Sequence, residues 1–227
     1  MKRYVIGNWK CHKNSDDAQR WFTRFAELYE PRDGVEVVIA PSFLCLEGVA
    51  AHLKSLGLAN VSLAAQDVSP FPRGGYTGAV AVDMLRGLVK YVIVGHSERR
   101  RYFHETTRDV ANKVAEISDT ALIPIVCVDH SFANSQLSPL HDIDLSQIIV
   151  AYSPVDALNF NIPESPEKVE EVVGNLRKMH ESWPVVYGGA LLPSNVKKYF
   201  SLPSLAGVFV GASSLDPEEF IKICREA

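Results

Sequence analysis

Short apolar runs alternate with longer amphipathic stretches along the chain. Most of the runs are apolar throughout, which is typical of parallel strands buried on both faces. Eight runs are candidate strands: Tyr4–Trp9, Glu36–Ala40, Val61–Ala65, Tyr91–Gly95, Leu122–Val128, Gln147–Tyr152, Val185–Gly188 and Gly207–Val210. Strands that alternate with helices predict repeated βαβ units and a parallel sheet. With eight such units, we expect an α/β barrel.

Residues that typically begin a helix precede the amphipathic stretches. Asn14–Asp17 opens one helix, Ser165–Glu167 another, and Asp216–Glu219 the last. In each, an Asn, Ser or Asp side chain is placed to cap the first turn. Because linkers, repeats and low-complexity segments are absent from the sequence, we expect residues 1–227 to form one domain.

The connection between the fifth and sixth strands is an exception. Asp129–Ser146 is rich in Ser, Asn, Gln, His and Asp, and Pro139 interrupts it. A full helix with two loops is hard to fit there. We therefore expect a shortened or missing fifth helix, with the outer face of these two strands thinly covered. A subunit contact over that face and a plain deletion both remain open.

Composition excludes several classes of protein. A net charge of −4 argues against nucleic acid as a partner, because binding a polyanion needs a basic face. The apolar runs are shorter than the roughly 18 residues that span a bilayer, so we expect no membrane span. The run Met1–Ile6 enters the first strand directly, and from it we expect no signal peptide.

The four cysteines lie far apart, without the spacing of a metal site. They are Cys11, Cys45, Cys127 and Cys224. We expect reduced, mostly buried thiols in a cytoplasmic protein, and neither a metal nor a cofactor.

Polar residues follow two of the strands, where α/β barrels place their chemistry. The first strand ends in Gly7-Asn8-Trp9-Lys10, and the fourth in Gly95-His96-Ser97-Glu98. A lysine at an apolar strand end is costly unless it meets an anion or reaches the surface. His96 begins a helical turn, whose N-terminus disfavours imidazolium, so it is a candidate neutral hydrogen-bond donor; a structural histidine is the alternative.

These two segments, the second extended to Arg100, resemble signature segments of the triosephosphate isomerase family. The similarity continues in order through Ala40–Phe43, Ala64–Asp67, Gly75–Gly78, Pro124–Cys127, Tyr187–Gly189 and Val210–Ser213. Each piece is short, but the ordered set covers essentially the whole chain. The resemblance implies a TIM (βα)8 barrel with a shortened or missing fifth helix.

The family interconverts dihydroxyacetone phosphate and glyceraldehyde 3-phosphate with a glutamate base beside a neutral histidine. By matching position, the resemblance makes Lys10 the cation, Asn8 its neighbour, His96 the electrophile and Glu98 a buried carboxylate. Backbone N–H groups of the last two loops would hold the phosphate of a small phosphorylated metabolite. On this reading the substrate-binding residues are Asn8, Lys10, Gly189, Ala190, Gly211 and Ala212.

The family's base is missing. Its segment Ala-Tyr-Glu-Pro-Val-Trp reads here Ala151-Tyr152-Ser153-Pro154-Val155-Asp156, so Ser153 occupies the glutamate position. A serine hydroxyl without an activator is too weak a base to take a carbon-bound proton. Losing a positioned base costs roughly 10²–10⁴ in rate, so we expect activity to be strongly reduced or lost. Among other carboxylates, Asp156, Glu164 and Asp129 (the last placed to pair with His130) make poor replacements.

The lid and the phosphate grip differ too. The lid hinge carries Asp156 in place of tryptophan, and its tip reads Leu158-Asn159-Phe160-Asn161 instead of a glycine-rich run. Ala190 replaces a serine, and Ala212 a glycine. Three interpretations remain: an enzyme with residual catalysis, a non-catalytic phospho-metabolite-binding protein, and an isomerase or lyase with an altered substrate. A decayed or altered copy in which only the fold survives is the alternative to all three.

The loop Asp67–Gly78 is nearly full length. In the family this loop docks into a partner subunit, so the resemblance implies a homodimer through the region around Thr77. Ala79 replaces the acidic residue usual after Tyr-Thr-Gly, which alters that contact.

Overall fold

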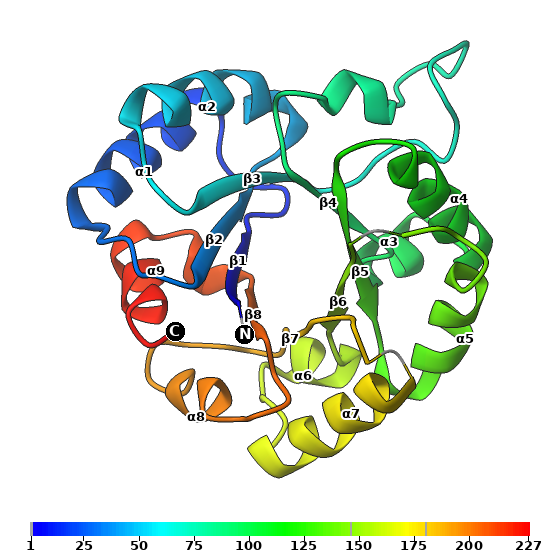
Figure 1. The fold of residues 1–227 in the computed structure, drawn as a ribbon. Coiled ribbons are helices and arrows are strands. Elements are labelled where there is room, and N and C mark those ends of the chain that lie inside the picture. Colours follow the sequence, from blue (N-terminus) through cyan, green and yellow to red (C-terminus); the bar gives the residue numbers. More distant parts are fainter. Residues whose placement is uncertain (1, 146, 180) are drawn as a thin grey trace.

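The computed structural model describes residues 2–145, 147–179 and 181–227; Met1, Ser146 and His180 lie outside the described residues. Eight parallel strands pair in chain order, and the first also pairs with the last, so the sheet closes into a barrel. Helices surround it (Figure 1). The predicted TIM (βα)8 barrel is therefore confirmed, with every predicted strand found within two residues of its expected ends. The strands are β1 Arg3–Asn8, β2 Val35–Ala40, β3 Val61–Ala65, β4 Tyr91–Val94, β5 Ile123–Val128, β6 Ile149–Tyr152, β7 Val185–Tyr187 and β8 Gly207–Val210.

The predicted caps also form. Asn14 and Asp17 make a reciprocal capping box at the start of α1, and Asp216 accepts hydrogen bonds from the backbone N–H groups of Glu218 and Glu219. Such caps fix where a helix begins, because they satisfy backbone donors that have no partner within the helix. The helices are α1 Ser15–Leu28, α2 Phe43–Leu56, α3 Ser97–Tyr102, α4 Thr107–Ser118, α5 Ala133–Leu137, α6 Val155–Phe160, α7 Pro166–Met179, α8 Lys197–Phe200 and α9 Pro217–Cys224. Four short 3-10 turns are η1 Val82–Leu85, η2 His130–Phe132, η3 Ser138–Leu140 and η4 Ala212–Ser214.

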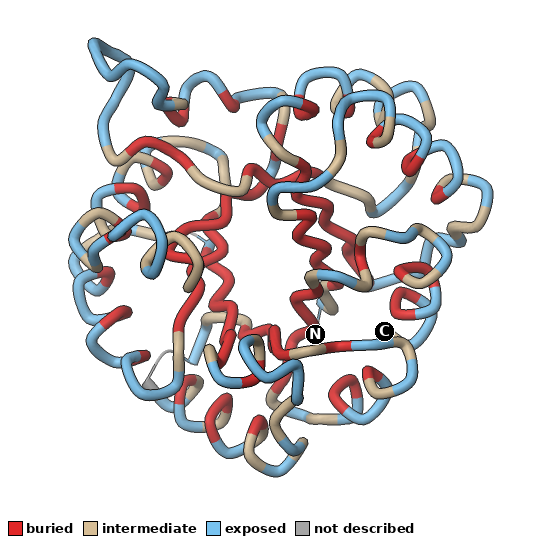
Figure 2. The backbone as a smooth tube through the Cα atoms, turned by 180° about the vertical axis from the view of Figure 1, so that it is seen from behind, coloured by how far each residue is buried: buried red, intermediate tan, exposed pale blue. Residues whose placement is uncertain are grey.

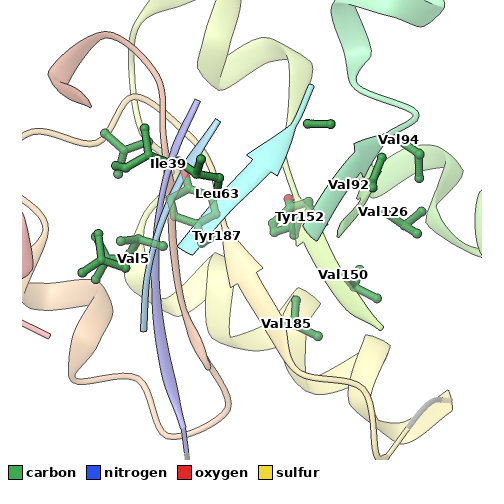
Figure 3. Packing of buried hydrophobic residues seen from close by; sticks show 14 of the residues in the cluster. Val5, Ile39, Leu63, Val92, Val94, Val126, Val150, Tyr152, Val185 and Tyr187 are labelled. Atoms are coloured by element: carbon green, nitrogen blue, oxygen red, sulfur yellow. The ribbon is translucent and has the colours of Figure 1, made fainter. Parts of the chain in front are cut away.

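Successive side chains along each strand point to opposite faces of the sheet, so the buried residues form two hydrophobic layers. One layer packs strands against helices and includes Val92, Val126 and Val150 of three neighbouring strands (Figure 3). The other contains strand residues such as Ile6, Ala151 and Phe209 and fills the barrel interior. In Figure 2 the central ring is accordingly mostly buried, and in the helices around it buried and exposed stretches alternate.

The fifth unit is shortened, as expected, to α5 flanked by the turns η2 and η3. The expectation that strands β5 and β6 are thinly covered is wrong. Leu137 and Leu140 are 1% exposed, and Val128 and Val150 beneath this layer are 2% and 1% exposed. The helix α5 and the turn η3 cover the face because they bury Ala133, Leu137 and Leu140 in the layer that packs on the strands.

All four cysteines are free; Cys11 is exposed and the other three are buried. Across the described ranges, no helix has both the length and the apolar character that a membrane crossing requires. Within those same ranges, no group of three or more His, Cys, Asp or Glu side chains is arranged to hold a metal ion.

Candidate active site

Strand alternation decides which side chains reach the barrel interior at the carboxyl end. Ala151 belongs to the inner layer and Tyr152 to the outer one, so Ser153 continues the inner set. The same alternation carries Asn8 inward after Ile6 of the inner layer. The mouth of the barrel is therefore lined by residues just beyond the apolar strands, as in α/β barrels generally.

Lys10 is held in place by its neighbours. Its φ of 52° lies in the left-handed region, which costs a non-glycine residue energy. The Asn8 side chain accepts a hydrogen bond from the Lys10 N–H at 3.0 Å, and Gln66 donates to the Lys10 carbonyl at 2.9 Å. The Lys10 ammonium meets the Glu98 carboxylate at 2.5 Å. The left-handed backbone and the ion pair with Glu98 together hold the Lys10 ammonium at the carboxyl end of the barrel.

The expectation of a buried Glu98 is wrong: its side chain is 41% exposed. Glu98 lies in the first turn of α3, at the open end of the barrel, where neighbouring elements do not cover it. Its pairing with Lys10 is nevertheless as the resemblance implies, because that pairing depends on the proximity of the two strand ends and not on burial.

His96 is 5% exposed and directly precedes α3. Its Nδ1 accepts a hydrogen bond from the Glu98 backbone N–H at 3.2 Å, which assigns the ring proton to Nε2. Burial lowers the His96 pKa to about 4, although the Glu98 carboxylate opposes this and Lys10 reinforces it. Nδ1 also lies 3.5 Å from a Glu98 carboxylate oxygen, but a neutral ring makes this a contact and not an ion pair. The ring is therefore neutral at pH 7, with a hydrogen-bond donor available on Nε2.

Ser153 is 3% exposed, and its backbone N–H donates to the Val128 carbonyl of β5 at 2.9 Å. Its hydroxyl has no hydrogen-bond partner among the described residues. A methyl group at Gly188 would lie 2.8 Å from this hydroxyl, so the next strand end packs closely against it. The residue is thus fixed and inward-facing, without a partner that could activate it.

The loops after β7 and β8, which the resemblance predicts to hold a phosphate, lie beside this serine, but not every predicted residue faces the cavity. Ala190 has a φ of 48°, the left-handed region that a glycine would adopt at lower cost. Gly211 faces Lys10, since a methyl group added there would lie 3.7 Å from the lysine Cε. Gly189 instead backs onto the ring of Tyr187 and is not part of the cavity wall.

A cavity of about 270 Å³, here called the main cavity, joins these groups. It brings together, from the ends of five strands, Asn8, Lys10, His96, Glu98, Ser153, Ala190, Gly211 and Ala212. Arg101 and the lid residue Asn159 also line it and are joined by a 3.3 Å hydrogen bond. Sequence reasoning missed Arg101; the run of three arginines after Glu98 was the available signal.

The replacement carboxylates are engaged elsewhere. Glu164 accepts a hydrogen bond from the Tyr152 hydroxyl at 2.6 Å, and Tyr152 belongs to the outer layer, on the opposite side of β6 from Ser153. One Asp129 oxygen accepts hydrogen bonds from the N–H groups of His130 and Val155, at 2.9 and 3.3 Å. Asp129 is therefore held by backbone donors, and neither carboxylate reaches the main cavity.

The long connection after β3 reaches away from the barrel (Figure 1). Thr77 is exposed on it, and Phe71 and Tyr76 stack with their ring centroids 4.7 Å apart while remaining 46% and 44% exposed. Half-exposed aromatic rings on a projecting loop form an apolar surface that no other described residue covers fully.

Comparison with known proteins covers almost the entire chain. The family model described as triosephosphate isomerase matches residues 3–227. The chain is 33% identical to a triosephosphate isomerase of Mesomycoplasma hyorhinis, over 98% of this chain and 97% of that protein. It is 30% identical to the one from Thermodesulfovibrio yellowstonii, over 99% of each chain, and 33% identical to the one from Stenotrophomonas maltophilia, over 100% of this chain and 98% of that protein. The chain therefore belongs to the triosephosphate isomerase family.

Proposed function

We propose that this protein binds a small phosphorylated metabolite at the main cavity and isomerises triose phosphate far more slowly than an enzyme with a glutamate base, or not at all. The observation that carries the proposal is Ser153, whose hydroxyl stands at the inward end of β6 where the family segment has glutamate. Isomerisation must move a proton between adjacent carbons, and a neutral, unactivated hydroxyl accepts a carbon-bound proton poorly.

The other half of the site supports ligand binding. Lys10 offers a positive charge, and neutral His96 offers the Nε2 hydrogen bond to a carbonyl or enediolate oxygen. Asn8 and Glu98 position the lysine, while backbone groups at Ala190, Gly211 and Ala212 supply the anion grip. None of these roles needs a metal or a cofactor.

A coupled assay of triose phosphate isomerisation tests the proposal on the unmodified chain and on Ser153→Glu. We expect the variant to be faster by roughly 10²–10⁴, since a positioned general base contributes about that much. Ser201→Glu, on the exposed end of α8, is the charge-matched control and should change nothing.

Near-normal activity of the unmodified chain would show that Ser153 does not disable it. An inactive but folded Ser153→Glu variant would instead favour the second candidate, a non-catalytic binding protein or an enzyme with an altered substrate. The altered lid, with Asn159 tied to Arg101, is the observation that favours this candidate.

The assembly follows from the projecting loop. We propose a one-domain cytoplasmic protein that forms a homodimer through the loop around Thr77, where Phe71 and Tyr76 stay 46% and 44% exposed among the described residues. Sedimentation equilibrium should give twice the chain mass. A monomer at micromolar concentration would contradict the dimer.

A further inference from the structure

The charges that line the main cavity do not balance. Among the described residues of this lining, Lys10, Glu98 and Arg101 are charged at neutral pH. Lys10 and Glu98 form an ion pair at 2.5 Å, so their charges compensate each other. His96 is neutral, because burial lowers its pKa to about 4. The lining therefore keeps one positive charge in excess, and Arg101 carries it.

Arg101 differs in this respect from its neighbours on α3. Arg99 pairs with the carboxylates of Asp67 and Glu105, at 2.8 and 3.3 Å. Arg100 is only half-buried as well, but its Nε and Nη1 donate to oxygens of nearby residues. Arg101 is exposed, and no carboxylate of the described residues lies within ion-pair distance of it. Its charge is thus available to a ligand.

Two uncharged neighbours hold the Arg101 guanidinium at the cavity. Nη1 donates to the Asn159 side chain of the lid at 3.3 Å, and the guanidinium carbon lies 5.3 Å from the centroid of the Tyr102 ring. Asn159 and Tyr102 both line the main cavity. One bond to Asn159 leaves most of the five guanidinium N–H donors without a protein acceptor. The carboxylate of α6, Asp156, is not part of the lining.

The free charge lies close to the paired one. Glu98 and Arg101 are three residues apart on α3, so they share one face of the helix with a rise of about 4.5 Å between them. Glu98 holds the Lys10 ammonium, and a methyl group added at Gly211 would lie 3.7 Å from the lysine Cε. Lys10 therefore borders the end that the proposed function gives to the phosphate, and Arg101 borders the lid.

We propose that Arg101 binds a second anionic group of the ligand, so that the main cavity takes a short phosphorylated carboxylic acid in preference to a triose phosphate. The inference rests on the proposed function, which places the phosphate at Ala190, Gly211 and Ala212. The planar fork of a guanidinium matches the two oxygens of a carboxylate. A carboxylate also brings one negative charge for the one in excess, whereas a second phosphate would bring about two.

Calorimetry with 3-phosphoglycerate and glycerol 3-phosphate tests the proposal on the full chain. The two compounds share the carbon chain and the phosphate, and differ in a carboxylate against a hydroxymethyl group. Arg101→Gln should weaken 3-phosphoglycerate about tenfold, because a hydrogen bond to a charged group is lost, and should weaken glycerol 3-phosphate less than about twofold. Arg101→Lys keeps the charge without the fork and should weaken 3-phosphoglycerate about threefold.

Arg108→Gln, on an exposed position of α4 outside the cavity lining, is the charge-matched control and should leave both affinities unchanged. Asn159→Ala removes the lid partner of Arg101 but leaves the guanidinium. It should therefore shift both affinities together and keep their ratio. Because Arg101 is exposed, its replacement leaves the buried core intact.

Equal weakening of both compounds in Arg101→Gln would overturn the proposal, since Arg101 would then act through the lid and not on the carboxylate. An unchanged preference for 3-phosphoglycerate in that variant would overturn it as well. In both cases the unmodified chain still binds the phosphates, so the proposed function stands. If neither compound binds the unmodified chain, the proposed function fails and this inference fails with it.

Discussion

The two sides of the main cavity differ in how their polar atoms are partnered. On the Lys10 side, the Asn8 oxygen, the lysine ammonium and His96 Nδ1 each meet a specific partner within 3.2 Å. On the other side, the Ser153 hydroxyl has none within the described ranges. A side chain whose polar atoms are all hydrogen-bonded is pre-organised, whereas an unpartnered hydroxyl is uncharged and has no fixed orientation. One side of the cavity thus holds a pre-organised cation and a buried histidine, and the other holds an unpartnered hydroxyl.

The backbone conformation is alike at one residue on each side of the cavity, but the side chains differ. Lys10 and Ala190 both adopt left-handed φ values, 52° and 48°. Lys10 gains an ion pair from this geometry, while Ala190 has no side-chain donor to offer. The strain at Ala190 therefore persists because Asn195, which donates to the Ala190 carbonyl at 3.1 Å, and the surrounding loop hold it. The left-handed backbone at Ala190 is therefore present although its side chain offers no donor.

The largest expected effect is coupling between the two sides. In the Ser153→Glu background, His96→Gln should lower kcat by roughly 10²–10⁴, because the restored base then works with the neutral ring as electrophile. In the unmodified chain the same change should lower kcat less than about threefold. The coupled assay on all four proteins measures this. Equal losses in both backgrounds would mean that the two sides act independently.

The next effect is a loss of folding stability at acidic pH that depends on His96. A folded pKa of about 4, below the ordinary 6.5, means that the unfolded chain binds the extra proton first. Stability should therefore fall as pH drops from 6.5 towards 4 and level off below that. Between pH 7 and 4.5 we expect urea unfolding to lose about 2–3 kcal/mol more than it does in His96→Gln.

The exposed His12 gives the control, since His12→Gln should behave like the unmodified chain. The same acid loss in His96→Gln would show that the ring is not held neutral by burial. That result would remove the main electrostatic difference between the two sides of the cavity.

The smallest of the three effects is on binding. Lys10→Met should weaken 2-phosphoglycolate, a phosphate ester that carries a carboxylate, by roughly 10–100-fold, as losing a hydrogen bond to a charged group costs about 1.5–3 kcal/mol. Calorimetry measures it, with the exposed Lys54→Met as the charge-matched control. Equal affinity in both variants would show that the Lys10 side does not hold the ligand.

Much of the fold was predictable because burial leaves a direct mark on sequence. Strands covered on both faces must be apolar throughout, so all eight were placed within two residues. The helix starts at Asn14 and Asp216 followed from capping chemistry, which is local. The cover of β5 and β6 was mistaken because a short helix, α5, and the separate turn η3, and not one periodic helix, bury Leu137 and Leu140.

The candidate site was predictable only as a set of residues. Ordered motifs identified Asn8, Lys10, His96 and Ser153, and these do line one cavity. The motifs did not reveal that Gly189 turns towards Tyr187, that Glu98 is 41% exposed, or that the Ser153 hydroxyl is buried without a partner among the described residues. Exposure and orientation depend on neighbours from distant strands, which no single segment encodes.

By itself, the sequence determined the barrel, its strand order and the presence of a serine at position 153, because strand burial, helix caps and residue identity are local properties. Only the tertiary structure decided that His96 is neutral, that Glu164 bonds to Tyr152 on the other side of β6 and that Ser153 lines the same cavity as Lys10. Those facts arise from desolvation and contacts between segments tens of residues apart, which exist only once the barrel has closed.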